Sequence, residues 1–465
     1  MRLKLLTLCL LMTCQCAMAA KGGYKVVLQI DDNHDSIMLM GYYYAQDTYV
    51  CDTAVNDGHG RFVFEGKREM LPGLYFFTNP KGRYVEFVNY NEPINFRFHT
   101  TESDWRGNMK VKGSRQNELF IAYHNDNEAI YTALRKAKSE LDSVAFAAYQ
   151  EQAFARLDSI KLALINNHPE SMAAKMINST RPVEVPVANQ QGDTLDSRAR
   201  FDYFMAHYFD NIPLDDNMIV RTPKALFYQH VMDYVDHYMK GMPPTLICPL
   251  LDTMIDRSEK APEVYKWLVH TMTEKFLQSN VMVYDEVYVH LVQRYYASGK
   301  AFWSSPSVID EQVERATKWE RLLVGKEAPE LIMFDTLHRP CSLHHMPGQF
   351  TLLVFWSPTC GHCREAIPAL YKVFDRIADS LDIYAYTVLT EPDEVTVKKW
   401  KKFIADNNIN NRRWVNLNGG EANVDWREVY DVTVTPQVFL INNHDHKFMA
   451  KKLNAELLDN ISKYL

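Results

Sequence analysis

The chain of 465 residues is too long for one ordinary hydrophobic core, so two or three domains are expected. Its composition, 47% hydrophobic and 23% charged, is typical of a soluble globular protein. A net charge of −7 provides no basic field for nucleic acid or for an anionic lipid surface, so we expect no nucleic-acid partner.

The first 19 residues have the pattern of a secretory signal peptide. Arg2 and Lys4 precede an apolar run over residues 5–12, and Ala17-Met18-Ala19 supplies the small-x-small pattern of a cleavage site. This arrangement predicts export of the mature chain to the periplasm or cell envelope.

A lipoprotein is the alternative, with Cys14 or Cys16 as the acylated residue. Thr13 and Gln15 are poor choices for the small residue that lipoprotein processing expects before the cysteine, so soluble export is favoured. After the signal, no stretch approaches the roughly 20 uninterrupted apolar residues of a membrane-spanning helix.

Residues 20–113 form the first predicted domain. Runs such as residues 24–30, 61–65 and 84–88 alternate between polar and apolar side chains, and turn signals such as Pro72-Gly73 separate them. Many short strands with this punctuation predict an antiparallel β-sandwich or open barrel.

Residues 114–322 form the second predicted domain, in which apolar side chains recur at helical spacing. Leu119, Phe120, Tyr123, Ile130, Ala133, Leu134, Ala137 and Leu141 mark one helix or a closely joined pair, and Phe154, Leu157, Ile160 and Leu164 mark the next. The pattern predicts an all-α domain without a catalytic constellation. Its histidines His207, His230, His237, His270 and His290 are irregularly spaced, so structural roles are favoured over metal binding.

Residues 325–465 form the third predicted domain, an α/β fold. Strands are expected over residues 349–356, 383–389, 414–417, 438–441 and 447–450, and helices over residues 366–380, 395–407 and 455–464. Strands alternate with helices and are followed by a hairpin and a last helix.

Five cysteines remain after the signal, and an odd number in an exported protein argues against a framework of structural disulfides. Cys51 and Cys248 are predicted to be buried thiols that behave as small hydrophobic residues. The same interpretation is favoured for Cys341, with a position nearer the last two cysteines as the alternative. Those two, Cys360 and Cys363, form a Cys-x-x-Cys motif.

The motif Cys360-Gly361-His362-Cys363 lies where an apolar strand passes into a helix. Cys360 is therefore expected at the helix N-terminus, where free backbone N–H groups and the macrodipole favour a thiolate. Cys363, one turn later, is within disulfide reach. This arrangement suits thiol–disulfide exchange, in which one sulfur attacks and the other resolves the mixed disulfide.

A structural zinc site is the alternative for such a pair, since zinc takes four ligands. His344, His345, His444 and His446 could supply nitrogens, but no second Cys-x-x-Cys is present. A Cys-x-x-Cys beside a strand–helix pattern favours redox chemistry, so we expect no metal and no other cofactor.

A set of motifs resembles the thioredoxin superfamily, in particular its TlpA/ResA-like envelope branch. The set consists of Trp356, the Cys-Gly-His-Cys motif, Pro368, Val434-Thr435-Pro436-Gln437-Val438-Phe439-Leu440-Ile441 and the lead-in Val324-Gly325-Lys326-Glu327-Ala328-Pro329. The resemblance covers about residues 325–465. It implies that Cys360 is the nucleophile, that Cys363 is the resolving thiol and that Thr435-Pro436 is a cis peptide facing the sulfurs.

The same resemblance places Trp356, Gly361, His362, Thr435 and Pro436 in the active-site environment. The sequence departs from the family at two positions. Thr359 stands where thioredoxins commonly have tryptophan, and Ala366 stands where many TlpA/ResA-like proteins have a glutamate. Proton transfer at Cys363 is thus left without an obvious carboxylate.

The first two domains resemble uncharacterised families that precede such domains in envelope proteins.

These observations predict an exported thiol–disulfide oxidoreductase that acts on protein or small-thiol disulfides, as reductase or isomerase. The resemblance implies a membrane thiol electron donor. A peroxidase of the same superfamily is an alternative, although Pro358-Thr359 abut Cys360 and do not match the Pro-x-x-x-Thr-x-x-Cys motif. An envelope binding or assembly protein with an accessory redox domain is another.

His362 between the cysteines predicts a pair more oxidising than that of thioredoxin, because a protonated imidazole stabilises the thiolate of the reduced form. Gly-His also separates the active cysteines of protein disulfide isomerases. We expect a potential between about −270 mV, the value of thioredoxin, and about −180 mV, that of protein disulfide isomerase.

Overall fold

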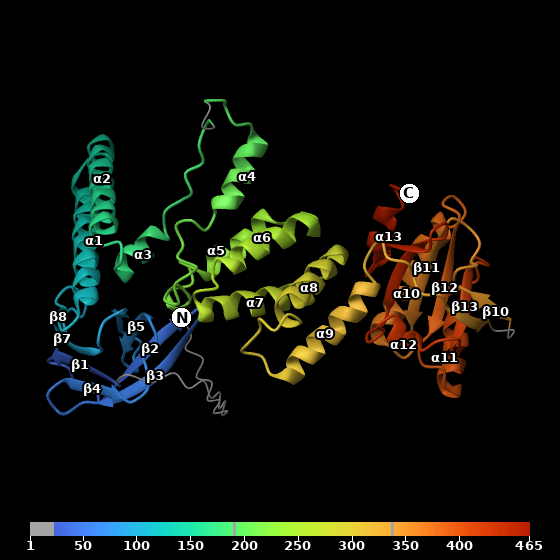
Figure 1. Ribbon diagram of the computed structural model, residues 1–465, viewed down its shortest axis with the longest axis horizontal. Coiled ribbons are helices and arrows are strands. Elements are labelled where there is room, and N and C mark those ends of the chain that lie inside the picture. The colour runs from blue at the N-terminus through green and yellow to red at the C-terminus, as the bar shows by residue number, and fades with distance from the viewer. Residues whose placement is uncertain (1–22, 189–191, 336–338) are drawn as a thin grey trace. The chain divides into compact units, whose positions relative to one another are not determined.

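The computed structural model describes residues 23–188, 192–335 and 339–465 (Figure 1). The predicted signal peptide and the cysteines in it lie outside the described residues. The chain divides into two compact units, one of Met1–Lys240 with Arg257–Val264, and the other of Gly241–Asp256 with Tyr265–Leu465. None of the helices in the described ranges combines the length and the apolar character needed to cross a membrane.

Two four-stranded sheets open the first unit. Their strands are β1 (Tyr24–Asp31), β2 (Ile37–Tyr44), β3 (Asp47–Val55), β4 (Arg61–Gly66), β5 (Gly73–Thr78), β6 (Tyr84–Asn89), β7 (Asn95–Thr101) and β8 (Lys110–Lys112). The strand orders are β4-β1-β7-β8 and β3-β2-β5-β6. Alternate residues, such as Val26 and Leu28 on β1 or Tyr75 and Phe77 on β5, are buried in one shared hydrophobic core.

The expectation of a wholly antiparallel arrangement is wrong for one pair. β1 and β7 are parallel, with Lys25 opposite Asn95 and Asp31 opposite Thr101. The chain builds the other sheet with β5 and β6 before it returns beside β1, and such a crossover allows parallel pairing. The period-two pattern shows which side chains are buried but carries no information on strand direction.

Helices complete the first unit. They are α1 (Arg115–Glu140), α2 (Ser143–Asn167), α3 (Met172–Asn178), α4 (Ser197–His207), η1 (Ile219–Arg221), α5 (Tyr228–Asp233) and the π-helical turn η2 (Tyr234–Tyr238). The side chain of Ser114 caps α1 by accepting from the Asn117 N–H, and Asp142 caps α2. Ile130, Leu134 and Leu157 are buried between α1 and α2, as the helical periodicity predicted.

The helices of the second unit are α6 (Pro244–Asp256), most of α7 (Pro262–Leu277), η3 (Met282–Tyr284), α8 (Asp285–Leu291), the π-helical turn η4 (Val292–Tyr296) and α9 (Pro306–Arg321). The Nε2 atom of His290 lies 3.0 Å from both carboxylate oxygens of Asp252. The Tyr295 hydroxyl donates to the same carboxylate at 3.0 Å. This arrangement agrees with the structural role expected for His290.

A seven-stranded sheet follows in the second unit (Figure 1, orange to red). Its strands are β9 (Ile332–Asp335), β10 (Pro340–Ser342), β11 (Phe350–Trp356), β12 (Ile383–Leu389), β13 (Trp414–Ala422), β14 (Gln437–Asn442) and β15 (Lys447–Lys451), in the order β10-β9-β13-β12-β11-β14-β15. β13, β12 and β11 are parallel, and β14 and β15 continue the sheet in antiparallel fashion. This topology is the thioredoxin-like α/β fold that the motif predicted.

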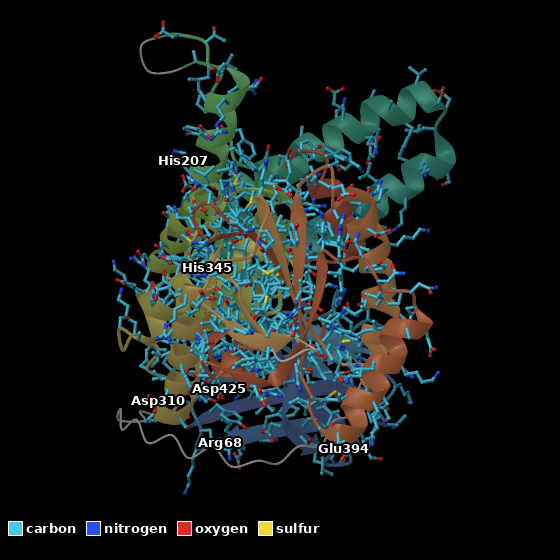
Figure 2. The ribbon with its side chains drawn as sticks, turned by 90° about the vertical axis from the view of Figure 1, so that its right-hand side faces the viewer. Arg68, His207, Asp310, His345, Glu394 and Asp425 are labelled. Atoms are coloured by element: carbon cyan, nitrogen blue, oxygen red, sulfur yellow. The ribbon has the colours of Figure 1, made fainter. Side chains whose placement is uncertain are left out.

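Helices cover both faces of this sheet. They are α10 (Gly361–Ile377), α11 (Glu394–Asp406), α12 (Trp426–Val429) and α13 (Ala455–Ile461). Leu352, Val354 and Trp356 of β11 belong to one buried core, together with residues of α10 and α13, while Leu353 and Phe355 belong to the core on the opposite face, with Trp426 of α12. Figure 2 labels Glu394 at the start of α11 and Asp425 just before α12.

Helix α10 begins at Gly361, five residues before the predicted start at residue 366. Arg364 and Glu365 in its first turn are exposed, so no apolar periodicity marks this turn in the sequence. The early start places the whole Cys-x-x-Cys motif at the helix N-terminus.

A buried ion cluster joins β15 to α8 within the second unit. Asp285, only 1% exposed, accepts from the Nζ atoms of Lys451 at 2.5 Å and of Lys452 at 2.7 Å. Lys451 Nζ also donates to the carbonyl oxygen of Leu322 at 3.1 Å. A buried ammonium is tolerated only when it is paired and hydrogen-bonded, so removal of the carboxylate would leave Lys451 uncompensated.

Asp285→Asn should therefore lower the free energy of unfolding of the second unit by about 3–5 kcal/mol. Asp310→Asn, at an exposed position of α9 (Figure 2), should change it by less than about 0.5 kcal/mol. Urea unfolding of the full chain, followed by tryptophan fluorescence, measures both variants. Equal effects of the two substitutions would contradict the importance of this cluster.

Candidate active site

The two cysteines of the motif occupy different positions at the junction of β11 and α10. Cys360 is the N-cap residue of α10 and is partly exposed, with φ −73° and ψ 124°. Cys363 lies in the first turn of the helix and is fully buried. The unpaired N–H groups and the positive end of the helix macrodipole thus lie beside the more accessible sulfur.

A loop from the neighbouring strand completes the site. The peptide bond between Thr435 and Pro436 is cis, as expected. The Cys360 thiol donates a hydrogen bond to the Thr435 carbonyl oxygen, with 3.3 Å between the atoms. β14 pairs with β11 up to Gln437 opposite Phe355, and this register brings the loop beside the cysteines.

The two thiols differ in pKa. Burial tends to raise the pKa of Cys360, but hydrogen bonds from the Thr435 side chain, from Cys363 and from the backbone N–H groups of Cys363 and His362 outweigh it, so that the pKa lies below the usual 9.0. Burial raises the pKa of Cys363 to about 11. Cys360 is therefore the thiol that ionises first, as a nucleophile requires.

Three other residues predicted for the site lie around this pair. Trp356 is fully buried in the same core as Cys363, with its ring 5.3 Å from that of Phe403. Its ring thus belongs to the buried core that also holds Cys363 and against which Cys360 packs. Gly361 and His362 are exposed at the start of α10. Their part in the chemistry stays a prediction.

A carboxylate that is not among the predicted site residues lies near the motif. Glu391 accepts hydrogen bonds from the Ser357 hydroxyl, at 2.7 Å, and from the Thr359 hydroxyl. The bond from Thr359, which has the larger effect, and the bond from Ser357 hold the pKa of Glu391 below its usual range. The carboxylate thus fixes the segment that leads into Cys360. The sequence signal that could have located Glu391 is its position just after β12. Because β12 and β11 are parallel, they end at the same edge of the sheet, and Cys360 follows β11 there.

The histidines considered as zinc ligands lie elsewhere. The rings of His344 and His446 stack with centroids 4.1 Å apart. Within the described ranges, no group of three or more histidine, cysteine, aspartate or glutamate side chains is arranged to hold a metal ion.

The five described cysteines are all free thiols, but the prediction of burial is wrong for Cys51, which is exposed. Met40 pairs with Asp52 and Gly41 with Val50, so Cys51 is the extra residue of a β-bulge and has no position in the ladder. Cys248 and Cys341 are partly buried.

Comparison with protein families finds two domains. Residues 22–120 match a domain of unknown function (DUF4369), and residues 161–319 match another (DUF5106). Both uncharacterised families expected before the redox domain are thus present.

Several solved structures are similar to this chain. One is a thioredoxin-like protein from Bacteroides caccae, 17% identical, with a TM-score of 0.48, covering 61% of this chain and 99% of its own. A domain of a possible thiol-disulfide isomerase from Cytophaga hutchinsonii is 29% identical, with a TM-score of 0.28 over 30% of this chain and 92% of its own. The thioredoxin domain of a thiol-disulfide oxidoreductase from Bacteroides vulgatus is 26% identical, with a TM-score of 0.27. The match covers 30% of this chain and 96% of that domain.

The C-terminal part of the chain is thioredoxin-like. Its sheet topology, its Cys-x-x-Cys at a helix N-terminus and its neighbouring cis-proline are the features of the thioredoxin-like fold expected from the motifs. A separate match of 84 residues, 33% identical, is to the sex determination and dosage compensation protein sdc-2 of Caenorhabditis elegans. It covers 18% of this chain, which spans only 3% of that relative.

Limiting iodoacetamide should label Cys360 before Cys363, because only the thiolate reacts. The rate at Cys360 should level off below pH 9, whereas the rate at Cys363, with a pKa of about 11, should still rise there. Mass spectrometry of the labelled peptides measures each site, with Cys341, whose pKa burial raises to about 11, as internal comparison. Earlier labelling of Cys363 would reverse the assigned roles.

Glu391→Ala should lower the free energy of unfolding by about 1 kcal/mol at neutral pH, because the buried Ser357 hydroxyl loses a charged acceptor. The exposed Glu394→Ala, which removes a pair with Lys398 one turn away and a negative charge at the N-terminus of α11, should change it by less, about 0.5 kcal/mol. Since the folded state depresses the Glu391 pKa, its contribution is present above pH 4.5 and disappears as the pH falls through the folded pKa. Denaturant titrations at several pH values measure this, and a pH-independent difference would contradict the assignment.

Proposed function

We propose that this protein is an exported thiol–disulfide oxidoreductase that works through the Cys360–Cys363 pair. The observation that carries the proposal is the asymmetry of the two thiols. Cys360 is partly exposed, has a lowered pKa and lies 3.3 Å from the Thr435 carbonyl oxygen, while Cys363 is buried one turn along the same helix. One thiol is thus prepared to attack and the other to resolve.

The reductive direction needs no group beyond the two thiols. The Cys360 thiolate attacks one sulfur of the substrate disulfide, forms a mixed disulfide and releases the other sulfur as a thiolate. Cys363 then loses its proton and attacks Cys360, which expels the second substrate thiolate and leaves a Cys360–Cys363 disulfide. The two substrate thiolates take up two protons, of which one equals the proton lost by Cys363 and the other comes from solvent. Two electrons pass from the protein to the substrate.

The surface beside the sulfurs suits an extended polypeptide. Thr435 precedes the cis-proline, and Val434 next to it is 71% exposed. An exposed apolar side chain beside a strand end can contact a substrate chain while backbone groups pair with it. Protein disulfides are therefore the proposed substrate class, with small-thiol disulfides as simpler ones.

The proposed site of action is the cell envelope. The leader pattern over residues 1–19 supports action in the periplasm or cell envelope. Repeated turnover as a reductase requires a thiol donor, for which a membrane thiol protein is the proposed class. As an isomerase, the enzyme needs only the reduced pair at the start of each cycle.

Cys360→Ser should abolish reduction of a disulfide substrate such as insulin, since the attacking sulfur is absent. Cys363→Ser should instead accumulate a mixed disulfide through Cys360, because the resolving sulfur is absent. Cys341→Ser, a partly buried thiol outside the motif, is the matched control and should keep full activity. Non-reducing gels and mass spectrometry read both outcomes. A mixed disulfide mapped to Cys341, or activity that survives in Cys360→Ser, would refute the proposal.

A further inference from the structure

In the described part of the chain, one edge of β6 in the N-terminal domain has no neighbouring strand. In the sheet order β3-β2-β5-β6, β6 pairs with β5 on one side only, from Gly73 opposite Asn89 to Thr78 opposite Tyr84. The open side of β6 faces α1, and the two elements are in contact. An unpaired strand edge presents backbone N–H and C=O groups that can pair with another chain.

At one position, a side chain of α1 takes the place of a strand. The Val88 N–H donates to Asn117 Oδ1 at 2.8 Å, and Asn117 Nδ2 donates to the Val88 carbonyl oxygen at 2.7 Å. The Asn117 carboxamide therefore makes both bonds that a neighbouring strand would make. It also shows that the backbone groups of Val88 point away from β5.

The same geometry applies two residues earlier. Backbone groups in an antiparallel ladder alternate between the two sides of a strand, so the N–H and C=O of Glu86 also point away from β5. Among the described residues, neither group has a hydrogen-bond partner. Glu86 therefore offers a donor and an acceptor side by side at the open edge.

These free groups lie at a cavity. A hollow of about 240 Å³ is lined by Glu86 of β6, by Phe120 and Ile121 of α1, and by Met109 from the preceding turn. A second hollow of about 210 Å³ shares Glu86 and Phe120 with it and is lined further by Leu74. Apolar side chains thus form walls next to an unpaired main-chain segment.

Charged groups border the first hollow. Glu86 and Asp104 contribute carboxylates and Arg106 a guanidinium, while Glu128 pairs with Arg135 of its own helix. The Tyr43 hydroxyl donates to one oxygen of Glu86 at 2.7 Å, which holds this side chain in place. Carboxylates therefore outnumber cationic groups at the rim, which favours a ligand with basic side chains.

We propose that this edge of β6 binds an extended peptide segment, whose main chain pairs with Glu86 and whose apolar side chain enters the cavity between β6 and α1. Addition of a strand to a sheet edge is a recurring mode of peptide recognition, in which main-chain bonds supply affinity and pockets for alternate side chains supply specificity. Alternating apolar and basic residues match this site, since every second side chain of a strand points to the same side. The proposal does not depend on the redox function, because binding involves no cysteine.

The probe is a short fluorescent peptide of alternating valine and lysine, titrated with the full chain and followed by fluorescence anisotropy. An analogue that is N-methylated at alternate positions has the same side chains but cannot donate main-chain hydrogen bonds. The first peptide should bind with a dissociation constant below about 1 mM, and the methylated one about tenfold more weakly. Equal binding of the two peptides, or no binding of the first at about 1 mM, would overturn the proposal.

Two substitutions at Glu86 separate the main chain from the side chain. Glu86→Ala and Glu86→Pro both remove the carboxylate, but only proline removes the outward N–H, and it spares the ladder because the ladder bonds belong to Val85 and Phe87. Glu86→Pro should bind about three- to tenfold more weakly than Glu86→Ala, as loss of one hydrogen bond implies.

Ile121→Trp gives a second test, which does not alter the strand. The larger ring should fill the cavity and weaken binding of the unmethylated peptide more than about tenfold. Circular dichroism establishes that each variant folds. If Glu86→Pro fails to fold, Ile121→Trp and the methylated peptide still decide the outcome, and unchanged binding in either would refute the site.

Discussion

The place of Cys360, between the end of β11 and the start of α10, is the constraint on which the active site depends. The pairing of β11 with β14 sets the distance from the Cys360 sulfur to the Thr435 carbonyl oxygen, and the helix provides N–H groups beside the same sulfur. A one-residue slip of β14 would send its side chains to the opposite faces and displace the cis-proline loop. The buried cores on both faces of the sheet resist such a slip.

The difference between the two thiols follows from that placement. A helix turn carries the chain from an accessible N-cap position to a fully buried one, and burial of Cys363 opposes its ionisation. Glu391 fixes the segment before Cys360 through the Ser357 and Thr359 hydroxyls. The hydroxyls of Ser357 and Thr359 thus have a structural role in this chain. Thioredoxins commonly have a tryptophan at the position of Thr359.

Periodic burial made much of the fold predictable. The strand over residues 383–389 was predicted with its observed bounds, since its ends coincide with the ends of an apolar run. Features that depend on pairing between distant segments were not predictable from local pattern. The parallel β1–β7 pair and the ion cluster around Asp285 are of this kind.

The same limit applies to the site. Cys360, Cys363, Thr435 and Pro436 carried recognisable motifs, and the structure brings them together. Glu391 carried no motif, because its importance lies in a contact with residues more than 30 positions away. The free backbone groups of Glu86 were likewise hidden, since no residue type reports an open strand edge.

The proposed chemistry requires that Cys360 and Cys363 form a reversible disulfide. Equilibration of the full chain in glutathione buffers of graded composition, with the Cys360–Cys363 disulfide quantified by peptide mass spectrometry, measures it directly. We expect a single two-electron transition between about −270 and −180 mV. A chain in which this disulfide never forms, or in which Cys360 pairs with another cysteine instead, would contradict it.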